Sequence, residues 1–143
     1  MGWVNDELAR IRKTKKQEEE RLKVQREKDH VARTKLPDLW KKLVEIINSN
    51  AVELEQAVRG VTLHVNATED ALAVTRPTDQ EPLLRLVLDR NELTIKYTGI
   101  VNGTFRVGLS EWDDPQLLCD GGTPMPLPKA CEAMLKPIVQ LFA

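Results

Sequence analysis

A stretch near the N-terminus, residues 13–30, is almost free of large apolar side chains. Its sequence is KTKKQEEERLKVQREKDH, in which Leu22 and Val24 are the only large aliphatic residues. Folding is driven mainly by the burial of apolar surface, so a segment of this composition cannot belong to a globular core. We therefore expect these residues to stay in water beside a body built from the rest of the chain.

Charge spacing predicts that this stretch is nevertheless helical. Lys, Glu, Gln and Arg are good helix formers, and an opposite-charge pair four residues apart adds about 0.2–0.5 kcal/mol to an isolated helix. The pairs are Lys15–Glu19, Lys16–Glu20, Glu19–Lys23, Lys23–Glu27 and Asp29–Arg33. We predict a solvated helical arm over residues 1–34 (the N-terminal arm) and an α+β globular domain over residues 35–143. Isolated helices are marginal in water, so the arm would become fully ordered only against a partner.

A 4-3 spacing runs along the arm and resembles the heptad seam of a coiled coil. Its apolar members are Val4, Leu8, Ile11 and Leu22. Four central positions of the same seam are polar, namely Lys15, Glu18, Gln25 and Asp29. A strong coiled coil needs apolar residues at these positions over several heptads, so the seam fails at these four positions.

Pro37 predicts a break or kink between the arm and the next helical segment. Proline clashes with the carbonyl four residues earlier, so a second helix with Thr34 as its N-cap and Pro37 in its first turn is expected. This segment carries a core-facing stripe of Leu36, Trp40, Leu43, Ile47, Ala51, Leu54 and Val58. Gly60 is the expected stop.

After Gly60 the apolar period changes from 3.6 to 2, which predicts strands. Five strands are expected near residues 61–67, 71–76, 83–89, 93–98 and 104–110, with a sixth near 116–119. Short links predict an antiparallel five- to six-strand meander. An amphipathic helix opening at Pro128 should pack on one sheet face through Cys131, Met134, Leu135, Ile138, Leu141 and Phe142.

The expected strand register predicts a row of cations on the outer sheet face. A tight turn at Arg90-Asn91 would pair Leu88 with Leu93, Leu86 with Ile95 and Leu84 with Tyr97. A five-residue loop before the next strand would pair Tyr97 with Phe105. Arg85, Lys96 and Arg106 then fall side by side, with Asn66 and His64 nearby. Like charges directly opposite are destabilising, so one interpretation is an anion site. The alternative is three solvated side chains, because surface charge rows usually contribute little.

Net charge is divided unevenly along the chain. Residues 10–35 carry 11 Lys and Arg against 5 Asp and Glu, whereas residues 36–143 carry 10 against 15. A basic arm on an acidic body indicates an interaction tail or contacts between subunits. A solvated helix that happens to be basic is the simpler interpretation.

Several function classes find no support in the sequence. Cys119 and Cys131 lack zinc-site spacing, no catalytic or phosphate-binding motif occurs, and no cofactor or metal is expected. The long stretch 111–127 contains Asp113, Asp114, Cys119 and Asp120 and is where an enzyme of unknown class would place its site. No apolar run of 18 residues occurs and no signal-peptide core precedes the arm, so a cytoplasmic protein is expected.

The features together favour a non-enzymatic interaction or oligomerisation module that works through its N-terminal helix. The candidate partner-binding residues are Trp3, Val4, Leu8 and Ile11, and the expected partner is a second copy or another protein. Residues 10–35 hold no aromatic side chain to stack on bases, which argues against nucleic acid. The apolar tip is short, which argues against a membrane surface.

Overall fold

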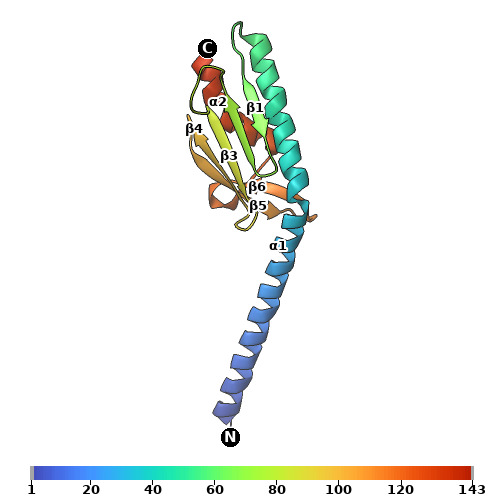
Figure 1. Cartoon of the computed structure of the whole chain (residues 1–143). Helices are drawn as coiled ribbons and strands as arrows, with labels where there is room; N and C mark the ends of the chain where they lie inside the picture. Colours follow the sequence, from blue (N-terminus) through green and yellow to red (C-terminus); the bar gives the residue numbers. More distant parts are fainter. Residues whose placement is uncertain (1, 143) are drawn as a thin grey trace.

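The computed structural model describes residues 2–142 and has α+β architecture, as predicted (Figure 1). Helix α1 spans Gly2–Ala57 and helix α2 spans Leu127–Phe142. The strands between them are β1 His64–Ala67, β2 Ala71–Thr75, β3 Leu84–Asp89, β4 Thr94–Gly99, β5 Gly103–Leu109, β6 Pro115–Leu118 and β7 Pro124–Met125, with a short 3-10 helix η1 at Asp120–Gly122. The sheet therefore has seven strands, one more than the upper count expected.

Helix α1 is continuous, so the predicted break before Pro37 is wrong. Thr34 does not cap a new helix; its Oγ1 donates to the His30 carbonyl at 2.9 Å, as within a helix. Pro37 is exposed. Because proline has no backbone N–H, the Arg33 carbonyl lacks the helical donor that residue 37 would otherwise supply. Leu36 and Trp40, on either side of it, are both buried in the same core, so packing holds the helix together across the proline. Figure 1 shows the helix axis bending gently along the body.

The predicted core stripe of α1 is confirmed from Leu36 to Leu54, whereas Val58 lies beyond the end of the helix and is half-buried. Its buried residues begin at Ala32 and continue through Leu36, Leu39, Trp40, Leu43, Ile47, Ala51 and Leu54. In α2 the buried residues are Ala130, Cys131, Met134, Leu135 and Ile138, whereas Leu141 is exposed, contrary to expectation. Phe142 is half-buried, and the guanidinium carbon of Arg76 lies over its ring, 5.6 Å from the ring centre.

The seven strands form one antiparallel meander in the order β1-β2-β3-β4-β5-β6-β7. Strand β3 alternates buried and exposed residues along its length. Leu72, Leu86, Ile95, Phe105 and Leu117 share one buried cluster with both helices. The opposite face, which carries Arg85 and Lys96, is exposed. One sheet face thus forms the core with α1 and α2, and the other faces solvent.

The β3–β4 connection corrects the predicted register by two residues. Strand β3 pairs Leu88 with Ile95 and Leu86 with Tyr97. The loop is four residues long because the Asp89 carboxylate accepts the amides of Asn91 and Glu92, both at 3.0 Å. Leu93 closes the loop at φ 53° with its side chain buried. The local hydrogen bonds of Asp89 therefore override the tighter turn.

The β4–β5 connection is displaced in the same way. Ile95 pairs with Phe105 and Tyr97 pairs with Gly103, with five residues between the last pair, as many as predicted but one position earlier. A Cβ at Gly103 would lie 2.2 Å from the Tyr97 hydroxyl oxygen, so the tyrosine side chain needs glycine opposite. Because both shifts are even, each residue keeps its predicted face of the sheet.

The long stretch 111–127 is more regular than expected. It contains β6, η1 and β7, and the predicted sixth strand is confirmed. The preceding turn is organised by Ser110, whose Oγ accepts the amides of Trp112 at 3.3 Å and Asp114 at 3.2 Å. Asp113 adopts φ 57° in this turn, and its amide donates to the Ser110 carbonyl at 3.0 Å. These aspartates serve the turn, as the simpler interpretation of the sequence had it.

Candidate interaction surfaces

The N-terminal arm extends away from the body into solvent (Figure 1). Every side chain from Gly2 to Lys28 is exposed, and the first buried residue is Ala32. The four candidate partner-binding residues lie at its distal end with 79% of Trp3, 49% of Val4, 44% of Leu8 and 40% of Ile11 exposed. Val4, Leu8 and Ile11 recur at helical spacing and share one face. The described part of the body does not cover this face.

Few contacts within the arm involve its charges. Arg10 pairs with Glu7, and Gln25 donates to Asp29 at 2.9 Å. In residues 2–142, the five ion pairs expected at four-residue spacing all lie beyond 4 Å. Long exposed side chains lose rotamer freedom when they pair, and the gain in water is small. Lys15 and Glu18 on the seam therefore keep their charges in solvent.

The base of the arm is fixed to the body by Arg33 and Lys35. Arg33 donates to the Arg90 carbonyl at 3.2 Å through Nε and to the Asn91 carbonyl at 3.0 Å through Nη2. Lys35 Nζ donates to the Asp113 carbonyl at 2.7 Å. Both side chains reach loop carbonyls at the end of the sheet. These bonds fix the direction in which the arm leaves the body.

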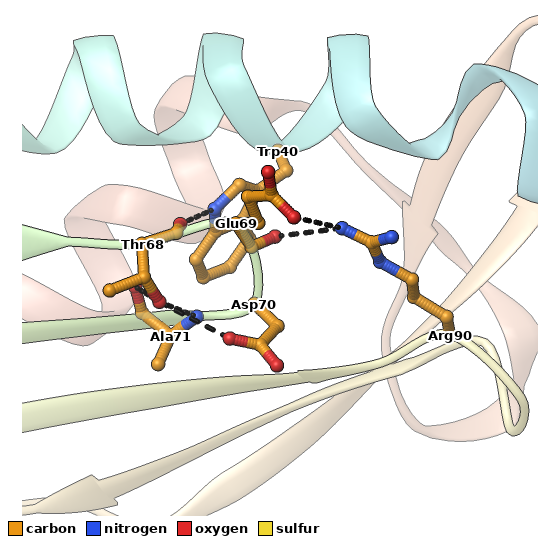
Figure 2. A network of polar contacts seen from close by, with 6 residues as sticks. All are labelled: Trp40, Thr68, Glu69, Asp70, Ala71 and Arg90. Atoms are coloured by element: carbon orange, nitrogen blue, oxygen red, sulfur yellow. Dashed lines mark hydrogen bonds and ion pairs between the residues drawn. The ribbon is translucent and has the colours of Figure 1, made fainter.

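A second anchor, centred on Trp40, holds the β1–β2 turn against α1 (Figure 2). Trp40 Nε1 donates to the Thr68 carbonyl at 2.8 Å, and Thr68 Oγ1 accepts the Ala71 amide at 3.1 Å. Arg90 reaches the same turn, with Nη2 3.4 Å from the Glu69 carbonyl and 3.7 Å from its carboxylate. The β1–β2 and β3–β4 loops and α1 are thus joined at one end of the sheet.

A polar cleft of about 470 Å³ lies where the arm meets the sheet. Gln25, Asp29 and Ala32 of α1 form one side, and the β3–β4 loop forms the other through Asn91, Glu92 and Leu93. Arg106 also lines it. The sequence did not predict this cleft, because the expected two-residue loop would not bring Glu92 and Leu93 beside the arm. The available signal was Asp89 itself, because an Asp side chain at the end of a strand commonly accepts the backbone amides that follow it in a turn.

The three predicted anion-binding cations do not form a row. The register places each opposite an uncharged residue: Arg85 opposite Thr98, Lys96 opposite Thr104 and Arg106 opposite Thr94. Consecutive cations are therefore offset by two residues along a diagonal of the exposed face. This arrangement avoids the like-charge contacts that a straight row would impose.

The remaining candidate residues of this face keep their expected neighbours. Asn66 pairs with Ala73, and Ala73 pairs with Arg85, so these three share one row. His64 lies opposite Thr75, two positions from Asn66 on the same strand. Asp89 also points to this face, but its carboxylate is bonded to loop amides. The result is an open sheet surface with separated positive charges.

Neither cysteine belongs to a metal-binding group. Among residues 2–142 there is no set of three His, Cys, Asp or Glu side chains placed to hold a metal ion. Burial raises the pKa of the Cys131 thiol to about 12. Cys119 is half-buried and its Sγ lies 3.3 Å from the Thr123 carbonyl. Both thiols act as small packed side chains.

Comparison with protein-family models, with characterised proteins and with solved structures found no match for this chain. Within residues 2–142, neither helix contains an apolar stretch long enough to cross a bilayer. The exposed arm, the cleft at its base and the open sheet face are therefore the features from which function has to be argued.

Proposed function

We propose that this protein is an interaction module whose N-terminal arm binds a second copy of the same chain. The observation that carries this proposal is the exposed apolar seam of Val4, Leu8, Ile11 and Leu22 along a rod that the body leaves bare. Helical residues on one face at this spacing bury their apolar surface against another helix. An arm already helical and anchored at its base would lose little conformational freedom on binding.

A pair of exposed apolar residues in the arm provides a matched test. Leu22 lies on the seam with 49% of its surface exposed, and Val24 lies off the seam with 50% exposed. We expect Leu22→Glu to weaken self-association of the full chain and Val24→Glu to leave it unchanged. Sedimentation velocity across a concentration series measures both.

Three outcomes count against the proposal. The full chain could remain monomeric up to about 0.5 mM, a concentration at which even a weak, submillimolar dimer is populated. The two variants could associate equally well. Alternatively, Val24→Glu could be the more damaging change, which would place the contact on another face of the helix.

The open sheet face supports a second candidate, a binding surface for a small anion or an acidic ligand. Arg85, Lys96 and Arg106 are all exposed on a face that no helix covers, and each is flanked by uncharged neighbours. Inorganic phosphate titrated into labelled protein should then shift the amides of β3–β5 at low ionic strength. Replacing the three cations with Gln should remove those shifts, and their absence in the original chain would end this candidate.

An enzyme using residues 111–127 is a third interpretation of the sequence. In the structure Asp113 and Asp114 are part of the turn around Ser110, and Asp120 begins η1. These positions give no observation that favours a reaction.

A further inference from the structure

The charges on the arm seam distinguish the two directions in which a second copy could lie. In heptad terms, Leu8, Lys15, Leu22 and Asp29 occupy a positions, and Val4, Ile11, Glu18 and Gln25 occupy d positions. Two parallel arms in register would place Lys15 against Lys15, Glu18 against Glu18 and Asp29 against Asp29. Like charges at the centre of an interface disfavour that arrangement strongly.

An antiparallel pair removes every one of these conflicts, because a positions then face d positions of the other chain. One register places Lys15 opposite Glu18 of the second copy and Ile11 opposite Leu22 of the second copy. Two-fold symmetry repeats each contact, so two central ion pairs are flanked by two apolar layers. Of the four polar seam positions, Lys15 and Glu18 become complementary in this register, whereas Gln25 and Asp29 face Leu8 and Val4 of the second copy near the ends of the paired arms.

The flanking positions of the same register are complementary as well. Beside the seam, Arg12 lies across from Glu19 of the second copy, and Glu7 lies across from Lys28 of the second copy. All four residues are exposed in the structure. Charges at such flanking positions set partner choice and orientation in paired helices.

Neighbouring registers lose this agreement. A shift of one heptad in one direction places Leu8 opposite Glu18 and Ile11 opposite Lys15, so apolar side chains meet charges. The opposite shift places Leu22 opposite Glu18 and Leu8 opposite Ala32, which the sheet already buries. Both shifts separate Lys15 from Glu18 at the centre of the paired arms, whereas the favoured register leaves only one charged residue, Asp29 near the ends, opposite an apolar residue. A buried charge without a partner is costly, so both shifts are disfavoured.

The cleft at the base of the arm lies where the favoured register needs a receiving surface. Leu8 falls opposite Gln25 of the second copy and Val4 falls opposite Asp29 of the second copy, and Gln25 and Asp29 both line the cleft. Leu93 gives the cleft an apolar side chain, and its charged lining is mixed, with Asp29 and Glu92 beside Lys28, Arg33 and Arg106. Of these residues, Glu92 and Asp29 suit the incoming end of an arm, because a helix N-terminus is electrically positive.

We infer that two copies of this chain associate through antiparallel arms, with Lys15 of each copy opposite Glu18 of the other and each distal arm end entering the cleft beside Glu92 of its partner. This inference rests on the proposed function and specifies its geometry. The interface contains two contacts between the arm of one copy and the body of the other, in addition to the contact between the arms.

Charge reversal in full-length protein tests the central pairing. Lys15→Glu alone and Glu18→Lys alone each create two like-charge contacts, so each should weaken dimerisation by at least roughly tenfold. An equimolar mixture of the two variants should form a heterodimer about as tight as the original dimer. Mixing is decisive because it restores the contacts between chains without altering either chain. Lys16→Glu and Glu20→Lys, which lie on the outward side of the helix, are the matched controls.

A parallel pair would behave differently in the same experiment. The original chain and both single variants would then dimerise about equally, and only the mixture would bind more tightly. That result would overturn the antiparallel inference and leave the proposed self-association intact. A chain that is monomeric throughout would overturn both.

Cross-linking tests independently whether the two arms are antiparallel. With Cys119 replaced by Ser, the double variant Ile11→Cys, Leu22→Cys should form a covalent dimer on mild oxidation. Neither single variant should form a covalent dimer, because the two copies of one cysteine would be about 16 Å apart along the helices at 1.5 Å per residue. Covalent dimers from either single variant would contradict the antiparallel register.

Replacing Glu92 with Lys should weaken association of the original chain, and an unchanged association would remove the cleft from the interface.

Discussion

The thiol of Cys131 shows how burial alone changes the chemistry of a residue. It lies on the inner side of α2 with none of its surface exposed, and the pKa of the thiol rises from 9.0 to about 12. The thiolate is the reactive form of cysteine, so the folded protein keeps this side chain unreactive. Helical spacing correctly predicted that Cys131 lies on the core stripe, but spacing carries no information on the depth of burial.

The raised pKa of Cys131 predicts a loss of stability at high pH. Above pH 9 the unfolded chain releases the thiol proton while the folded chain retains it, so the free energy of unfolding falls as pH rises. The slope is about 1.4 kcal/mol per pH unit up to pH 12, or about 2 kcal/mol between pH 9 and 10.5. Urea unfolding of the original chain and of Cys131→Ala, under reducing conditions, should show the steeper decline in the original chain. Parallel declines would mean that the thiol does not contribute.

At the scale of elements, apolar periodicity predicted helices and strands, and local hydrogen bonds changed the register between the strands. The first six strands of the meander, the inner faces of β3, β4 and β5 and the stripe from Leu36 to Leu54 follow from apolar spacing, which is a property of each segment alone, whereas the two-residue strand β7 was not predicted. The strand register does not, because the Asp89 side chain lengthens the β3–β4 loop and moves Arg85 and Lys96 out of one row. The cleft at the arm base depends on that same loop, so the expected two-residue turn did not predict it.

Helix α1 crosses Pro37 because packing outweighs a local penalty. Leu36, Leu39 and Trp40 hold both sides of the proline in the core, whereas the predicted break followed from the clash with the Arg33 carbonyl alone. Tertiary packing supplies most of the stability of a helix of this kind. Neither the position of Pro37 nor the composition around it could reveal this balance without the sheet.

Replacing Pro37 with Ala is therefore expected to stabilise the protein. The side chain is exposed, so little packing is lost, and the new amide can donate to the Arg33 carbonyl. Proline inside a helix costs about 3 kcal/mol relative to alanine, which is the upper limit of the gain in the free energy of unfolding. Chemical denaturation measures it, with the exposed Lys41→Ala as a control in the same helix. A loss of stability would show that the proline relieves strain where α1 reaches the body.

For the whole molecule, the anchors at the arm base connect fold to function. Arg33 and Trp40 attach α1 to the loops at one end of the sheet, so the arm leaves the body in a defined direction. Residues 2–28 of α1 are exposed along the length of the arm (Figure 1). Self-association through its seam stays a prediction, since no single chain can display it. The antiparallel arrangement would place the two bodies at opposite ends of a paired rod.

The distance between the two arm ends in a dimer tests this arrangement most directly. A spin label at Trp3→Cys, with Cys119 replaced by Ser, lies at a site with 79% exposure. The antiparallel register sets Trp3 of one copy level with His30 of the other, so the two labels should be about 40 Å apart. Pulsed electron–electron double resonance measures this distance, and we expect a single maximum near that value. A distance below about 20 Å would indicate parallel arms, and the absence of a dipolar signal at concentrations that populate a dimer would contradict association through the arms altogether.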